Sequence, residues 1–189
     1  MKKTVLTFGL IAGAIVSVFM VLALAFKDAI GFDRGEIVGY TSMVVAFLFI
    51  YFGVRAYRDN VGGGTISFGR GVAVGALIAV LASACYVATW EVIYYNFTPD
   101  YIEKYRDHAI AKARADGESD AAIAEKAAKM DRLVELYKNP LLNAAFTFLE
   151  PLPVAAIVVL VSAGVLSRRK KSDQGVGVLD RSQSRALTP

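Results

Sequence analysis

Four long apolar runs restrict the fold of this chain more than any other feature of its sequence. They cover residues 5–26, 37–54, 71–95 and 142–166, and the last run contains Glu150. A helix rises about 1.5 Å per residue, so about 20 residues cross a hydrocarbon layer of roughly 30 Å. In lipid, a segment of open chain satisfies its own backbone hydrogen bonds only as a helix. Each run is therefore predicted to be a transmembrane helix.

We predict an all-α protein in which residues 1–171 form a single four-helix transmembrane domain. The composition agrees, because 56% of the residues are hydrophobic and 20% are charged, against about 45–50% and about 25% in soluble domains. Residues 172–189 are rich in Ser, Gly and Gln and are predicted to be a disordered cytoplasmic tail. The first run could be a secretory signal preceded by Lys2 and Lys3. It is longer than the apolar core of about 7–15 residues typical of signals, which favours an uncleaved helix.

The distribution of Lys and Arg predicts which side of the membrane each helix end faces. With a cytoplasmic N-terminus, nine Lys and Arg flank the inner helix ends and three flank the outer ends. Whole-loop counts are nearly equal, but residues close to the membrane matter more. We therefore expect a multi-pass protein of the bacterial inner (plasma) membrane with both termini in the cytoplasm. The net charge of +4 reflects these flanking residues, so no nucleic-acid partner is expected.

The connection between the third and fourth runs, residues 98–139, is predicted to be an extracytoplasmic helical hairpin. Thr98-Pro99-Asp100 supplies an N-cap, a proline at the first helical position and an acid in the first turn. Gly117 interrupts the pattern, and Ser119 can cap a second helix. A narrow, Ala-rich apolar stripe on that helix is expected to pack on the first helix or on the membrane surface. The stripe consists of Ile123, Ala127, Met130, Val134 and Tyr137.

Three glutamates are candidates for an ion or proton site near the outer face. Glu150 lies about 24 Å from the cytoplasmic end of the fourth run, or about 6 Å below the outer boundary. Glu91 and Glu36 reach the outer interface on the third and second runs. An ionisable group below the interface is costly and indicates a function. The alternative is structural: Glu150 caps a final helix that begins at Pro151.

The connection between the second and third runs carries basic residues at the predicted inner surface. Residues 64–70 faintly imitate a phosphate-binding loop, but Arg70 and Gly71 occupy the positions of its Lys and its Ser or Thr. We interpret the stretch as a cytoplasmic turn. Three arginines here are candidates to contact lipid phosphates: Arg55, Arg58 and Arg70.

No pattern in the sequence indicates catalysis, a cofactor or a metal. The one histidine, His108, has no Cys, His or acid around it at zinc-ligand spacing. Sequence motifs of hydrolytic nucleophiles and of zinc helices are absent. Cys85 lies within an apolar run and is expected to behave as a small hydrophobic residue. We expect a protein that is not an enzyme.

Small residues form a stripe on each of two predicted helices. Such stripes allow helices to approach closely. We interpret them as packing surfaces within this chain, with homo-oligomer formation as the alternative. The stripes are Gly9, Gly13 and Ser17 on the first run and Gly71, Gly75 and Ala79 on the third.

Several short stretches occur together in a recognisable order. Residues 40–53 are followed by Tyr57-Arg58-Asp59-Asn60 and by a Gly-Gly-Thr-Ile-Ser-Phe-Gly sequence at 63–69. Residues 137–140 read Tyr-Lys-Asn-Pro, and residues 146–153 read Phe-Thr-Phe-Leu-Glu-Pro-Leu-Pro. The combination resembles a bacterial membrane family catalogued as domain-of-unknown-function family 4199. The resemblance implies four membrane helices and an extracytoplasmic helical insert, and it implies no activity.

Two functions remain open from the sequence. In the first, a non-catalytic membrane protein binds lipid, another protein or its own copies through the outer hairpin or a polar helix face. In the second, a small transporter or ion- or proton-conducting protein uses Glu150, with Glu36 and Glu91 at its outer mouth. The exposed insert favours the first function, and the carboxylate below the interface favours the second.

Overall fold

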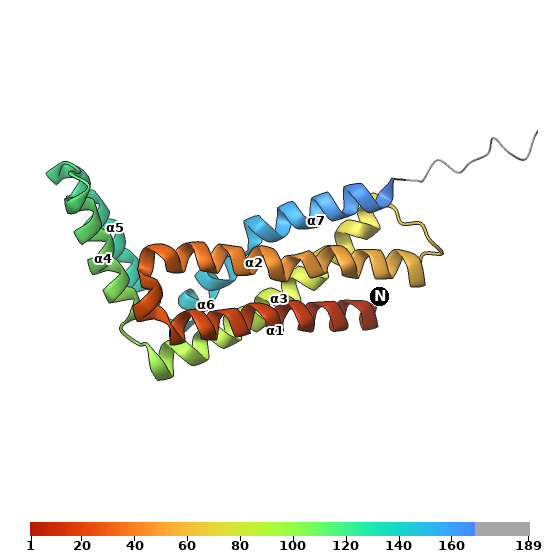
Figure 1. Cartoon of the computed structure of the whole chain (residues 1–189), viewed down its shortest axis with the longest axis horizontal. Coiled ribbons are helices and arrows are strands. Elements are labelled where there is room, and N and C mark those ends of the chain that lie inside the picture. Colours follow the sequence, from red (N-terminus) through yellow and green to blue (C-terminus); the bar gives the residue numbers. More distant parts are fainter. Residues whose placement is uncertain (169–189) are drawn as a thin grey trace, which may run out of the picture.

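The computed structural model describes residues 1–168, and this part of the chain is all-helical. Four long helical segments run side by side as a bundle, and a hairpin of α4 and α5 projects from one end (Figure 1). The predicted tail, 172–189, lies outside the described residues. The helices are α1 (Lys2–Ala25), α2 (Lys27–Asn60), α3 (Phe68–Phe97), α4 (Tyr101–Ala115), α5 (Asp120–Tyr137), α6 (Pro140–Leu149) and α7 (Leu152–Ser167).

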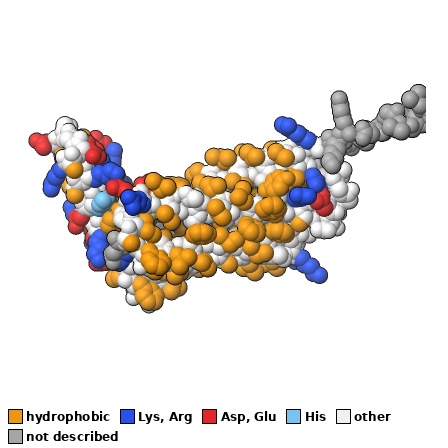
Figure 2. Space-filling view, viewed as in Figure 1, with side chains coloured by type: hydrophobic (Ala, Val, Ile, Leu, Met, Phe, Trp, Pro, Cys, Tyr) orange, Lys and Arg blue, Asp and Glu red, His pale blue; other side chains and the backbone are white. Residues whose placement is uncertain are grey.

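The outer surface of the bundle is largely apolar, as expected for a protein that is surrounded by lipid. Figure 2 shows apolar side chains over the body of the bundle, while charged side chains gather on the hairpin and at the opposite end. Soluble monomers rarely expose apolar patches of this extent. The prediction of an all-helical fold with four long apolar helices is confirmed. Among the described residues, the helices long and apolar enough to cross a membrane are Lys2–Ala25, Ala29–Asn60, Phe68–Phe97 and Pro140–Ser167.

Helix α2 is longer than the apolar run 37–54 that predicts it. It begins at Lys27, directly after α1, and its backbone is broken at Gly31 (φ 71°, ψ 165°). Glycine adopts such a positive φ at little cost, so the chain bends here without strain. The first turns of α2 contain charged residues such as Asp33 and Glu36, so a search for apolar runs does not detect this part of the helix.

Close approach of α1 to α3 depends on the predicted small residues. A Cβ added to Gly13 would lie 2.6 Å from the Cβ of Cys85, and one added to Gly9 would lie 2.7 Å from Leu81 Cδ2. The hydroxyl of Thr89 donates a hydrogen bond of 2.7 Å to Ser17 Oγ at the same interface. The first small-residue stripe therefore packs within the chain, as we predicted.

The stripe on α3 faces α7 and α2. A Cβ added to Gly71 would lie 3.1 Å from the Cβ of Ala163, and one added to Gly75 would lie 3.2 Å from Ile50 Cγ2. Large apolar side chains fill the rest of this interface. Those with at most 1% of their surface exposed are Phe47, Ile50, Val54, Val74 and Ile78.

Helices α6 and α7 form one bent span. Glu150 and Pro151, which join them, both keep right-handed helical backbone angles. Proline removes a backbone donor and so interrupts helical hydrogen bonding without reversing the chain. Asn139 begins the span, since its side chain accepts hydrogen bonds from the N–H groups of Leu141 and Leu142.

The hairpin forms largely as its sequence predicts. Gly117 turns the chain with φ 74°, and Ser119 Oγ accepts a hydrogen bond of 3.3 Å from Ala122 N–H. The predicted start of α4 is wrong: Thr98 does not cap this helix, which begins at Tyr101 after Asp100. The reason is that α3 continues to Phe97 and Thr98 terminates it.

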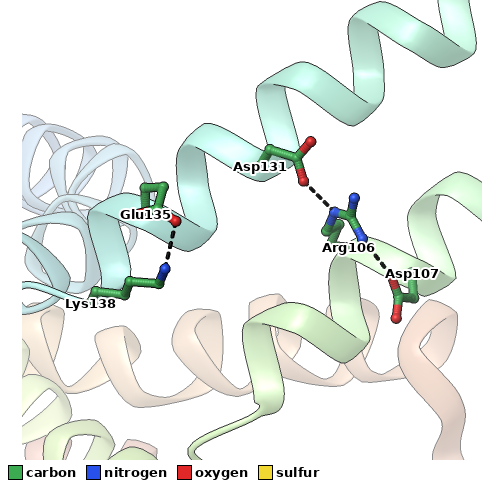
Figure 3. Close-up of polar contacts among 5 residues, drawn as sticks. All are labelled: Arg106, Asp107, Asp131, Glu135 and Lys138. Atoms are coloured by element: carbon green, nitrogen blue, oxygen red, sulfur yellow. Dashed lines mark hydrogen bonds and ion pairs between the residues drawn. The ribbon is translucent and has the colours of Figure 1, made fainter.

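Helices α4 and α5 pack along the predicted apolar stripe, whose five residues are all partly buried. An ion pair also crosses between them, because Arg106 Nε donates to Asp131 Oδ1 at 2.5 Å (Figure 3). Arg106 contacts the adjacent Asp107 at 2.9 Å as well. The hairpin is thus held by one apolar stripe and one interhelical ion pair.

Candidate functional site

A cavity of about 350 Å³ lies where the bundle meets the hairpin. Helices α1, α2 and α3 form its walls, and the first turn of α4 lies across it. Its volume falls within the range of about 300–1,000 Å³ usual for ligand sites. Much of the wall is apolar, including Val16, Phe19, Met20, Val38 and Met43.

Glu150 places a carboxylate in this cavity. Tyr86, which also lines it, donates a hydrogen bond of 2.9 Å from its hydroxyl to Glu150 Oε2. Glu150 makes no side-chain hydrogen bond to the first turn of α7. Pro151 has no N–H, so helical hydrogen bonding is interrupted at this junction and resumes where Ala155 N–H donates to the Pro151 carbonyl at 2.9 Å, while the side chain of Glu150 is held by Tyr86. The carboxylate is therefore directed to α3 and the cavity.

Charged side chains also line the cavity near the hairpin. Lys104 Nζ lies 2.5 Å from Asp100 Oδ2, so these two charges neutralise each other. The hydrogen bond from Lys104 lowers the pKa of the Asp100 carboxyl, which keeps the pair ionised. Lys27 lines the cavity too, from the first residue of α2.

Thr98 contributes a hydroxyl in unusual surroundings. The residue lines the cavity and only 7% of its surface is exposed. Within residues 1–168 its Oγ1 has no hydrogen-bond partner. A buried hydroxyl without a partner is costly, so a bound polar group would stabilise it.

Aromatic rings close the cavity on the hairpin side. Trp90 and Tyr101 pack edge to face with their centroids 5.3 Å apart, and Phe32 lies 5.7 Å from Tyr101. All three residues line the cavity. The orientation of the Trp90 ring is fixed by a hydrogen bond of 2.9 Å from its Nε1 to Oδ1 of the fully buried Asn143. This wall is therefore pre-formed.

The three candidate glutamates do not share this site. Glu150 lines the cavity, but Glu36 and Glu91 do not. Glu36 is exposed on α2, between the cavity-lining residues Gly35 and Val38. Glu91 follows Trp90 on α3, and one residue turns a helix by about 100°, so its side chain leaves in another direction. Its Oε1 is buried without a hydrogen-bond partner among the described residues.

The candidate arginines lie at the other end of the bundle, around the connection between α2 and α3 (Figure 1). Arg55 and Arg58 both contact Asp59, at 3.6 and 2.7 Å. Arg70 is exposed at the start of α3, where its N–H donates to Ser67 Oγ. Contact of these residues with lipid phosphates stays a prediction.

His108 contributes to the docking of the hairpin. Its Nε2 lies 3.3 Å from Asp33 Oδ1, which also accepts a hydrogen bond of 2.6 Å from Lys112. The His108 ring packs on Phe32 with centroids 5.2 Å apart. These contacts tie α4 to the segment of α2 that follows Gly31.

Reasoning from the sequence missed most of the cavity residues, among them Lys27, Tyr86, Trp90 and Thr98. One signal was available, since Tyr86 and Trp90 are four residues apart and so share a face of α3. Lys27 and Thr98 gave no such signal, because each lies at a helix end and joins the cavity only through tertiary packing.

The chain matches the family model described as "Protein of unknown function (DUF4199)" over residues 7–168. This range includes the bundle, the cavity and the hairpin. No curated protein and no solved structure matches the chain significantly. The match confirms the resemblance seen in the sequence, and the chain belongs to the DUF4199 family, whose function is unknown.

Proposed function

We propose that this chain is a non-catalytic, multi-pass protein of the bacterial inner membrane that binds a membrane lipid in the cavity beneath its hairpin. The observation that carries the proposal is that the cavity adjoins an apolar groove between the C-terminal ends of α1 and α3. Leu24, Lys27 and Thr98 line both spaces. One molecule that fills both spaces needs a polar end and an apolar end, which is the chemistry of a membrane lipid.

The groove suits an acyl chain. Apart from Lys27, Thr89 and Thr98, its lining is apolar. It lies on two of the helices that are long and apolar enough to cross a membrane. An acyl chain of the surrounding bilayer could enter from the side and stay in apolar surroundings throughout. The other lining residues are Val21, Leu24, Ala25, Ala88, Val92, Ile93 and Phe97.

The proposed topology places the hairpin outside the cytoplasm and both termini inside. The Lys and Arg bias at the helix ends supports it. The packing is consistent with it, since the N-terminus, the connection between α2 and α3 and the end of α7 lie at one end of the bundle (Figure 1). The cavity would then open at the level of the outer leaflet.

Ion or proton conduction through Glu150 is the second candidate function. The observation in its favour is that this carboxylate lines a cavity within a predicted span. Conduction also needs a polar path to the other side. Between the cavity and the opposite end, the bundle is filled by apolar side chains such as Phe47, Ile50 and Val74, each at most 1% exposed. This packing favours a closed binding site rather than a path that conducts ions or protons.

The charged outer surface of the hairpin is where we expect a protein partner or a second copy of the chain to bind. Its two helices expose many ionised side chains to solvent (Figure 2). Lipid binding in the cavity does not depend on such a partner.

A cavity-filling substitution tests the proposed function. Gly39 lines the cavity, and a Cβ added there meets nothing within 4 Å. The Leu side chain of Gly39→Leu should therefore begin in open space and extend into the cavity. Replacing a helical glycine with a good helix former also favours the helix by about 1 kcal/mol. Gly164→Leu is the matched control, because its Cβ also meets nothing within 4 Å and it does not line the cavity.

The measurement is native mass spectrometry of protein released from native membranes and exchanged extensively into detergent. We expect wild type and Gly164→Leu to retain phospholipid at a fixed ratio and Gly39→Leu to lose it. Equal retention by Gly39→Leu would show that no lipid occupies the cavity. A proton flux in proteoliposomes that Glu150→Gln abolishes would instead support the second function.

A further inference from the structure

We infer that the lipid in the cavity is an aminophospholipid, with its phosphate at Lys27 and Thr98 and its ammonium group against Glu150. The inference rests on the proposed function and specifies the headgroup. It follows from the order in which the chemical groups of the protein occur along the groove and the cavity.

The covalent order of a phospholipid matches the order of these side chains. The apolar groove leads to Lys27 and Thr98, which line both spaces, and Glu150 lines only the cavity. In a phospholipid, the acyl chains are followed by the phosphate and then by the headgroup substituent. With its acyl chain in the groove, a phospholipid would therefore bring its phosphate to Lys27 and Thr98 and its substituent to Glu150.

The shared boundary has the donors that a phosphate needs. Thr98 Oγ1 lacks a hydrogen-bond partner within residues 1–168, and because this atom is not exposed to the cavity, the side chain must rotate to donate to a phosphate. Among the side chains that the structure describes, none forms an ion pair with Lys27. Lysine binds phosphate as a point charge, and a hydroxyl can donate to a phosphate oxygen. Lys104 adds little charge, because Asp100 pairs with it.

Glu150, which lines the cavity but not the groove, selects a cation with N–H donors. Glu150 accepts one hydrogen bond, from Tyr86, in the described part of the chain. An ionised carboxylate can accept about four, so most of its capacity is open to a ligand. The rings of Trp90, Tyr101 and Phe32 line the same cavity, and aromatic faces attract cations.

The same groups disfavour other headgroups. An anionic substituent would meet the Glu150 carboxylate, and a neutral one would leave that charge without a counter-ion in a partly closed space. A quaternary ammonium could contact the rings but has no N–H to donate. The site therefore ranks a primary ammonium first, a quaternary ammonium second and an uncharged substituent last.

Lipid competition tests the ranking. Delipidated wild-type protein is offered phosphatidylethanolamine, phosphatidylcholine and phosphatidylglycerol with identical acyl chains, and bound lipids are counted by native mass spectrometry. We expect phosphatidylethanolamine to be favoured over phosphatidylglycerol by about ten-fold, the effect of one charge-assisted contact. Soluble glycerophosphoethanolamine, which lacks acyl chains, should compete poorly if the groove contributes as argued.

Substitutions of single residues test whether Glu150 is the source of the preference for phosphatidylethanolamine. Glu150→Gln keeps the shape of the side chain and should abolish the preference for phosphatidylethanolamine. Glu36→Gln is the matched control, since Glu36 lies at the same end of the bundle but does not line the cavity, and it should keep the preference. Lys27→Gln should weaken binding of all three phospholipids, because all three carry the phosphate.

The outcomes separate the inference from the proposed function. Equal retention of phosphatidylethanolamine and phosphatidylglycerol by wild type, or an unchanged preference in Glu150→Gln, overturns the headgroup assignment and leaves lipid binding intact. Retention that Gly39→Leu does not reduce overturns both. The wild-type competition needs no variant, so the inference stays testable if Glu150→Gln does not fold.

Discussion

The hydroxyl of Tyr86 donates a hydrogen bond of 2.9 Å to the carboxylate of Glu150, which lies 64 residues further along the chain. This contact joins α3 to the bend between α6 and α7, where Pro151 interrupts the helical hydrogen bonds. It fixes the carboxylate at the cavity wall. The position of this charged group therefore depends on an uncharged partner from another helix.

Loss of the Tyr86 hydroxyl should destabilise the contact between α3 and the bend of α6 and α7. Tyr86→Phe keeps the ring and removes the donor, so we expect a loss of stability of about 1 kcal/mol, the net value of one such hydrogen bond. Thermal unfolding in detergent measures it. Tyr95→Phe on the same helix is the control, because Tyr95 is 43% exposed and should tolerate the change. Equal melting temperatures for the two variants would mean that the contact contributes nothing to stability.

The interface between α1 and α3 should be intolerant of one added methyl group. In Gly13→Ala the new Cβ would lie 2.6 Å from Cys85 Cβ, so the helices must separate. We expect destabilisation of about 1–3 kcal/mol, typical of overpacking, although alanine is the better helix former. Gly164→Ala has open space around its Cβ and should not be destabilised. Thermal unfolding that ranks the two variants in the reverse order would contradict the packing of α1 on α3.

Accessibility of single cysteines should establish the topology. In a Cys85→Ser background, we expect Ser119→Cys in the hairpin to react with a membrane-impermeant maleimide in intact spheroplasts. Thr65→Cys, between α2 and α3 at the other end of the bundle, should react only after lysis. The opposite labelling pattern would place the hairpin in the cytoplasm and the cavity in the inner leaflet.

The ion pair between the two hairpin helices should contribute modestly to the stability of the hairpin. Arg106→Gln removes the contact with Asp131 shown in Figure 3. Both side chains are partly exposed, so the expected loss is below about 1 kcal/mol. Hydrogen–deuterium exchange should become faster in α4 and α5 and stay unchanged in α1. Lys138→Gln is the control, because Lys138 pairs with Glu135 three residues earlier and bridges no helices; an equal effect would exclude a specific interhelical role.

The features that could be predicted from the sequence are those that depend on residues within a single segment of the chain. The apolar runs predicted the four long helices, and Gly117 and Ser119 predicted the turn of the hairpin, because each signal acts locally. The depth of Glu150 in the membrane, which the helical rise gives, stays a prediction. Which side chains face the cavity did not follow, since that depends on the rotation of each helix against its neighbours. Glu91 and Trp90 are adjacent in sequence, yet only Trp90 lines the cavity.

The role of Tyr101 couples the hairpin to the interior of the bundle. This residue is the first of α4, and its ring is also part of the cavity wall, packed on Trp90 and Phe32. A displacement of α4 must therefore change the shape of the cavity, and a molecule that fits one shape better must bias the position of α4 by the same free energy. Whatever holds or pulls the far end of the hairpin acts, through Tyr101 and Lys104 of α4, on the occupancy of a site inside the bundle.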